Sequence, residues 1–175
     1  MQAFDGRIRR AEPSDAEALV AYLNKIGGES DNLTFGKDEF PIDAEQERAF
    51  LEAAKDGNEN IILIAEEAGR IIADGSIARG KRRFAHRAEL GITVLKEAWG
   101  RGVGTALMQA LIDAAKASGT ELINLEVRAD NSRAIRLYER FGFKRVGVSP
   151  AYMKIGGEYA DAVLMYLDLR ENRTV

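Results

Sequence analysis

The chain of 175 residues has no cysteine and only one histidine, His86. Without cysteine it can form neither disulfides nor a thiolate nucleophile, and one histidine cannot build a multi-histidine metal site, so no metal is expected. No apolar run approaches the roughly 20 residues of a membrane-spanning helix, and the N-terminus lacks a signal-peptide core. This predicts a cytoplasmic protein with no membrane partner. A net charge of -3 with a pI of about 5.4 gives no sign of a nucleic-acid partner.

The composition is that of an ordinary globular protein, with 46% hydrophobic and 30% charged residues. This length suits one domain with a sizeable core, and the absence of repeats, low-complexity tracts and linkers predicts a single domain over residues 1–175.

Hydrophobic periodicity predicts an α/β (mixed α+β) chain. Helices are expected after Pro13, where Ser14 and Glu17 form a possible capping box, and after Asp43. Two more are expected from about 103 to 119 and from 131 to 142. Strands are expected at 7–11, 61–65, 70–79, 88–94, 121–127, 143–148 and 159–169. This order of elements predicts a central mixed sheet with helices on both faces.

A glycine-spaced turn, Gly100-Arg101-Gly102-Val103-Gly104, joins the strand at 88–94 to a helix. Glycines let a ligand approach the backbone, and the free N–H groups of a first helical turn, with the helix dipole, attract anions. A dinucleotide fingerprint is broken because Leu107 stands at the third glycine position, and no Gly-Lys-Ser/Thr sequence occurs. The turn therefore predicts a pyrophosphate site, with a tight turn without ligand as the alternative.

The residues after this turn resemble the GCN5-related N-acetyltransferases, the GNAT family. The pattern Asn-x-x-Ala-x-x-x-Tyr-x-x-x-Gly-Phe is complete at Asn131, Ala134, Tyr138, Gly142 and Phe143. In the preceding Arg/Gln-x-x-Gly-x-Gly/Ala pattern both glycines are present, and Trp99 replaces Arg or Gln. The resemblance extends from about Arg7 to Leu169. It implies a GNAT fold, in which a mostly antiparallel sheet splays apart between strands 4 and 5.

The resemblance also implies acetyl-coenzyme A as cosubstrate, bound in that opening. The pyrophosphate would lie over the amides of 101–105, and the pantetheine arm would pair with the main chain of 92–94 like another strand. The implied coenzyme-binding residues are Ile92, Thr93, Val94, Arg101, Gly102, Val103, Gly104, Thr105, Asn131, Ala134 and Tyr138.

The family pattern implies a general acid at Tyr138 and an oxyanion donor at a backbone N–H near Val94. Tyrosine is protonated at neutral pH and could protonate the leaving thiolate, although the spacing also suits a core tyrosine. Glu89 is the expected general base, because strand alternation puts it on one face with Gly91 and Thr93. A solvated Glu89 paired with Arg87 is the alternative, and His86 is a second base candidate.

Glu29, Asp31 and Phe35 lie in a loop that commonly walls the acceptor pocket in relatives. Their carboxylates would attract a cationic amine, or they are ordinary solvated loop residues. The predicted function is acetyl transfer to a primary amine of a small molecule, such as an amino acid or polyamine, by direct attack. A protein N-terminal or lysine acetyltransferase, and a non-catalytic acetyl-coenzyme A sensor, are the alternatives. Relatives are often dimers, so a homodimer is a possible assembly.

Overall fold

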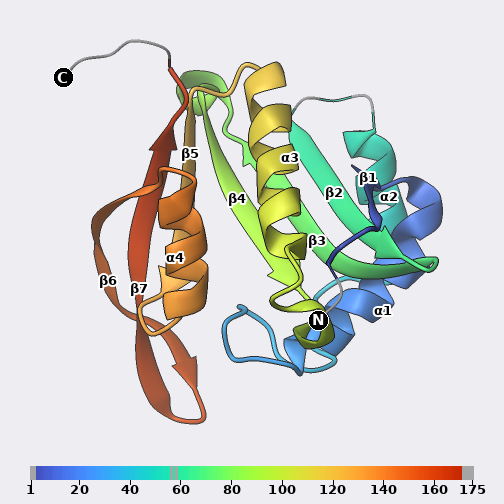
Figure 1. Cartoon of the computed structure of the whole chain (residues 1–175), viewed down its shortest axis with the longest axis horizontal. Coiled ribbons are helices and arrows are strands. Elements are labelled where there is room, and N and C mark those ends of the chain that lie inside the picture. Colours follow the sequence, from blue (N-terminus) through green and yellow to red (C-terminus); the bar gives the residue numbers. More distant parts are fainter. Residues whose placement is uncertain (1–2, 56, 58, 171–175) are drawn as a thin grey trace.

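The computed structural model describes residues 3–55, 57 and 59–170. Its seven strands form one sheet in the order β1-β2-β3-β4-β5-β7-β6. The strands are β1 (Arg7–Arg10), β2 (Asn60–Glu67), β3 (Arg70–Arg79), β4 (Arg87–Val94), β5 (Leu122–Arg128), β6 (Lys144–Ile155) and β7 (Glu158–Asp168). The helices are α1 (Ala16–Gly27), α2 (Ala44–Ala54), α3 (Val103–Ala117) and α4 (Ser132–Arg140). Figure 1 shows α3 and α4 side by side in front of the sheet.

The sheet is antiparallel except at its centre, where β4 and β5 run parallel. Their pairing covers only Arg87, Ala88 and Glu89 of β4, opposite 122–124 of β5. Beyond Glu89 the two strands have no paired residues, although each keeps its outer neighbour, β3 or β7. The predicted mixed fold, with a splay between strands 4 and 5 and helices on both faces, is confirmed.

Strand alternation sends neighbouring β3 side chains to opposite faces of the sheet. A Cβ added to Gly75 would lie 2.6 Å from Leu111 Cδ1, so this face of β3 packs directly under α3. On the other face, Tyr22 of α1 hydrogen-bonds to Thr93 of β4. The two layers bury a continuous apolar core that includes Leu107 and Ile123, and each such side chain stabilises the fold by about 1.5–3 kcal/mol.

The helices differ in how they begin. Asp43 caps α2, since its carboxylate accepts from the N–H groups of Glu45 and Gln46 at 2.9 Å. The start of α1 is not the expected Ser14 and Glu17 pair. A 3₁₀ turn over Pro13–Asp15 precedes the helix, and the Asp15 carboxylate accepts from Glu12 N at 2.7 Å. Asp15 is held there because Arg9 also binds it, at 2.6 Å.

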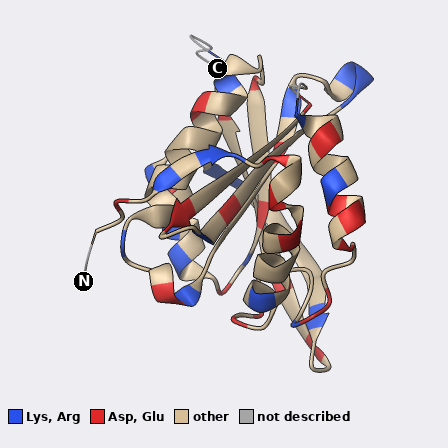
Figure 2. Ribbon diagram, turned by 90° about the vertical axis from the view of Figure 1, so that its right-hand side faces the viewer, with Lys and Arg blue, Asp and Glu red and all other residues tan. Residues whose placement is uncertain are grey.

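The last two strands form a long hairpin at one edge of the sheet (Figure 1). The expected strand at 143–148 is longer in the structure, where β6 runs from Lys144 to Ile155 with two register shifts. Figure 2 shows basic and acidic residues interspersed along the helices and strands. Among the described residues, no helix is long and apolar enough to cross a membrane.

Candidate active site

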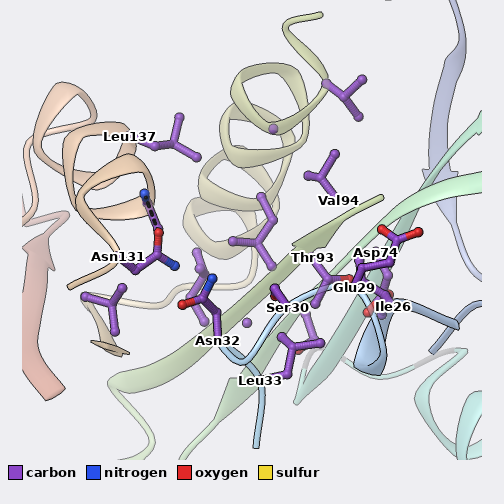
Figure 3. Close-up of a pocket in the computed structure, with 18 of the residues that line it drawn as sticks. Ile26, Glu29, Ser30, Asn32, Leu33, Asp74, Thr93, Val94, Asn131 and Leu137 are labelled. Atoms are coloured by element: carbon purple, nitrogen blue, oxygen red, sulfur yellow. Dashed lines mark hydrogen bonds between the residues drawn. The ribbon is translucent and has the colours of Figure 1, made fainter. Parts of the chain in front are cut away.

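A cavity of about 800 Å³ opens where β4 and β5 separate. Its wall includes residues from both faces of the sheet, so the opening connects the helix layers. The α3 side is formed by Trp99, by residues 102–105 and by α4. The α1 side is formed by α1, the loop after it and side chains of β3 and β4. In the close-up of Figure 3, Asn131 and Leu137 lie at one end, with Ile26, Glu29, Thr93 and Asp74 at the other.

The N-terminus of α3 lines the cavity with residues 102–105. Gly102 stands before the helix with φ of 88°, a left-handed conformation that favours glycine. Among the described residues no side chain caps this helix, and the first intrahelical bond runs from Ala106 N to Gly102 O at 2.9 Å. The N–H groups of the first turn and the positive end of the helix dipole therefore provide the features of an anion site.

The free space between the start of α3, α4 and β4 depends on the absence of a side chain at Gly104. A Cβ there would lie 3.6 Å from both Leu137 Cδ2 and Val94 Cγ2, an ordinary contact distance. A methyl group fits, whereas a longer side chain would extend between α4 and β4. The backbone cradle expected from the sequence is thus compatible with a large anionic ligand.

Trp99 and Arg133 form a second feature of the α3 side. The Trp99 indole donates from Nε1 to Val94 O at 2.7 Å. The Arg133 guanidinium lies over its ring, 4.7 Å from the centroid, and both residues line the cavity. Trp99 therefore fixes the end of β4 and holds a cation beside the N-terminus of α3.

Residues of α4 complete this side. Asn131 caps α4, because its Oδ1 accepts from Ala134 N at 3.1 Å. Asn131, Ala134 and Tyr138 all line the cavity. Tyr138 is 7% exposed and packs on Phe143 with ring centroids 5.7 Å apart. Burial raises the pKa of Tyr138 to about 12, so its hydroxyl stays protonated at neutral pH.

The α1 side is a largely apolar pocket whose wall includes the carboxylate of Asp74. Asp74 of β3 pairs with Thr93 of β4, so the two side chains share a face of the sheet. The Thr93 hydroxyl is 2.8 Å from Tyr22 Oη. Asp74 lines the cavity, and its Oδ1 is buried with no hydrogen-bond partner in the described chain.

This environment makes Asp74 hard to ionise. Burial, reinforced by the nearby charge of Glu47, raises the pKa of Asp74 to about 7, against a smaller opposing effect of the Gly75 amide. Glu47 of α2 is itself only 4% exposed, and burial raises its pKa as well. Burial is also the main reason that the pKa of Tyr22 is raised.

The loop after α1 brings two of its three expected residues to the cavity. Glu29 and Phe35 line it, whereas Asp31 does not. The Glu29 carboxylate accepts from Lys96 N at 2.6 Å, which ties the loop to the end of β4. Asp31 contributes its backbone carbonyl, which accepts from Arg128 at 2.8 Å.

The structure places Glu89 and Arg101 outside the lining of the large cavity. Glu89 is exposed and lies in a second hollow with Asn124 and Glu126. The Arg101 side chain forms an ion pair with Glu67 of β2. Any contact of Arg101 with a ligand at α3 would therefore come from its backbone.

The structure also gives the positions of Arg87, the expected alternative partner of Glu89, and of His86, the second base candidate. The Arg87 guanidinium donates to Asn124 Oδ1 at 2.7 Å, and no ion pair between Arg87 and Glu89 forms in the described chain. The His86 carbonyl accepts from the N–H groups of Glu121 and Leu122, at 2.8 and 3.1 Å, and His86 is outside both lined hollows.

The cavity residues that were not expected as site residues from the sequence include Asp74, Ser76, Arg133 and Trp99, the last as an indole donor. The sequence contains a signal for Asp74. Asp74 interrupts the apolar run of Ile71, Ile72 and Ala73, and a carboxylate in a buried strand needs a functional or structural reason.

Comparisons with known proteins agree with this architecture. Residues 29–143 match the acetyltransferase (GNAT) family. The chain is 28% identical over 169 residues to an L-methionine sulfoximine/L-methionine sulfone acetyltransferase of Pseudomonas paraeruginosa, covering 95% of this chain and 96% of the relative. It is 34% identical over 105 residues to the N-alpha-acetyltransferase RimI of Mycobacterium tuberculosis, covering 59% and 63%. A GNAT acetyltransferase structure from Streptococcus pneumoniae matches with a TM-score of 0.91 and 32% identity, covering 94% of this chain and 100% of that one.

The fold and these matches define an acyltransferase. More narrowly, the chain belongs to the acetyltransferase (GNAT) family and is an N-acetyltransferase.

Proposed function

We propose that the protein transfers an acetyl group from acetyl-coenzyme A to a primary amine of a small molecule by direct attack. The observation that carries this proposal is the single cavity at the β4–β5 split. It joins an uncapped helix N-terminus and Tyr138 on one side to a carboxylate-bearing apolar pocket on the other. When bound, acetyl-coenzyme A supplies the acetyl group as a thioester.

The α3 side has the features needed to hold the coenzyme. The amides of residues 102–105 would hold its pyrophosphate, and the Arg133 guanidinium would add positive charge nearby. The Oδ1 atom of Asn131 accepts a hydrogen bond from the Ala134 amide, so its Nδ2 group is the proposed donor to the coenzyme. Main-chain groups of 92–94 are the partners proposed for the pantetheine arm, except for the Val94 carbonyl, which Trp99 already occupies.

Tyr138 is the proposed general acid. A thiol has an ordinary pKa of about 8.5, well below the value of about 12 for Tyr138. Tyr138 therefore keeps its proton before reaction and stabilises negative charge as it develops on the departing sulfur by donating a hydrogen bond. The N–H of Val94 is the proposed donor to the oxygen of the reacting carbonyl.

The Pseudomonas relative is named for acetylating small amino acid derivatives and aligns over nearly the whole chain, which favours a small acceptor. Glu29 and Phe35, which line the cavity, and Asp31 beside them are the proposed elements of acceptor selectivity. The RimI match favours a second candidate, acetylation of protein N-termini, over a shorter stretch. We also expect a cytoplasmic location, with a homodimer as a possible assembly.

Release of free thiol from acetyl-coenzyme A, measured against polyamines, amino acids, aminoglycosides and short peptides, tests this proposal. Turnover confined to small amines supports it. Turnover confined to peptides would favour the second candidate, and coenzyme binding without turnover of any amine would overturn enzymatic acetyl transfer.

A further inference from the structure

The cavity contains a carboxylate to which neither the family pattern nor the proposed function assigns a role. Asp74 extends from the middle of β3, directly opposite Thr93 of β4, and faces the α1 side of the cavity. One of its oxygens is buried and unpartnered within the described residues. An unpaired carboxylate oxygen in an apolar pocket costs stability, so a structural role alone does not explain it.

The surroundings of Asp74 suit a cationic partner. From α2 it faces the buried carboxyl of Glu47, and from α1 it faces the Tyr22 hydroxyl. Its neighbour on β2 is the apolar Ile64, and its neighbour on β4 is Thr93. Glu29, farther along the same wall, is a further acidic group. None of these groups is basic, and the basic residues lining the described cavity, Arg133 and Arg140, both belong to α4.

We propose that Asp74 is the group that receives the acceptor's ammonium ion and removes its proton before attack. This inference rests on the proposed function and adds its general base. Asp74 lines the same cavity as Tyr138, the proposed acid, whereas Glu89 lies in the second hollow. Acid and base thus enter one cavity from opposite sides of the split sheet. Apolar walls formed by Leu23, Ile26 and Phe35 would take the acceptor's carbon chain.

The proton balance of the step is closed. The acceptor arrives as R-NH₃⁺ and gives one proton to the Asp74 carboxylate. Its nitrogen lone pair then forms the C–N bond to the acetyl carbon, and the C–S bond breaks. A second amine proton leaves with the sulfur by way of the Tyr138 hydroxyl, and Asp74 returns its proton to solvent. The products are the amide, the free thiol and one proton.

The test compares Asp74→Asn with wild type over pH 5–10, using acetyl-coenzyme A and the fastest amine of the panel. A base must be ionised to act, so wild-type kcat/KM should rise with pH to a plateau above about 7, following the raised pKa of Asp74. The Asn variant should lose about a hundredfold at pH 7. Its deficit should shrink toward pH 10, because an ordinary alkyl amine has a pKa of about 10.4 and then deprotonates in solution.

Further measurements separate catalysis from folding. Calorimetry should show coenzyme A binding to Asp74→Asn within twofold of wild type. Asp113→Asn is the matched control, since Asp113 is exposed on α3 and accepts a bond from Gln109 at 3.0 Å. This variant should keep the wild-type pH profile. In protein labelled with ¹³C at aspartate carboxyls, Asp74 should titrate near pH 7 without any ligand.

The outcomes discriminate between the two proposals. If wild type binds no coenzyme A or acetylates no amine, the proposed function fails, and the role of Asp74 fails with it. If wild type is active and Asp74→Asn matches it at pH 7, only the inference about Asp74 is overturned. The same holds if the loss is equal at every pH, if Asp74 titrates near pH 4, or if Glu89→Gln, rather than Asp74→Asn, abolishes the acidic limb.

Discussion

The two sides of the cavity are built from different materials. The α3 side presents backbone, namely the amides of residues 102–105 ahead of an uncapped helix. The α1 side presents side chains, with Asp74 and Thr93 set among apolar residues. A surface made of backbone keeps its function under many substitutions as long as the glycines remain, whereas a surface made of side chains can change with each replacement. On the proposed function, a generic anion cradle would thus be joined to an individual acceptor pocket.

The largest effect is expected from filling the cradle. Gly104→Leu should weaken coenzyme A binding about a hundredfold, because overpacking costs up to about 3 kcal/mol and each 1.4 kcal/mol is tenfold. Gly104→Ala is the control and should bind as wild type does, since its Cβ would meet Leu137 and Val94 at 3.6 Å. Isothermal calorimetry measures both. Retained affinity in Gly104→Leu would remove the pyrophosphate site from the α3 side.

Tyr138 lies where the two sides meet, and Tyr138→Phe should separate binding from chemistry. The ring packing against Phe143 is preserved, so coenzyme A affinity should stay within twofold. Turnover should fall about a hundredfold, the lower limit of general acid catalysis. Steady-state kinetics with calorimetry test this. Unchanged kcat would refute the assigned role.

The acceptor pocket should discriminate by charge. Phenethylamine and phenylalanine share an apolar body and differ in one carboxylate. That carboxylate would approach Asp74 with no basic lining residue on the described α1 side. We expect kcat/KM for phenethylamine to be about tenfold higher, on the order of 1.4 kcal/mol. Faster acetylation of phenylalanine would mean that a cation from outside the described cavity lining serves the acceptor.

The smallest effect concerns stability. The folded-state pKa of Asp74, about 7, lies above the ordinary value of 3.8. The unfolded chain therefore loses this proton first, and the folded state is progressively destabilised as pH rises from about 4 through 7. At pH 8 Asp74→Asn should raise Tm by several degrees, with little change at pH 4. Calorimetric scans at both pH values measure the difference, and a lower Tm at pH 8 would contradict it.

Sequence reasoning predicts the α3 side well because its parts are close together in the chain. Gly102 and Gly104 belong to one turn, and Asn131, Ala134 and Tyr138 to one helix. Their spacing along the chain is already their spacing in the site. All five of these residues line the cavity as expected. The side chain of Arg101, from the same turn, instead forms an ion pair with Glu67.

The α1 side is harder to predict because its residues meet only through sheet pairing. Asp74 becomes a site residue when β3 pairs with β4 in the register that sets it opposite Thr93. A shift of one residue would turn it toward α3 instead. The full length of β6 escapes prediction for a related reason. It is an edge strand whose residues are mostly exposed, so no apolar alternation marks its extent.

The early end of the β4–β5 pairing has a further consequence. It creates two strand edges in the interior of a continuous sheet, between β3 and β7. Edges at the rim of a sheet invite pairing with other chains, whereas these two lie inside the sheet, on the face that α3 and α4 cover (Figure 1). An extended arm as slender as pantetheine could still enter. The coenzyme would then serve as the sheet's missing strand, and its departure would leave the β4 and β5 amides newly open to hydrogen exchange.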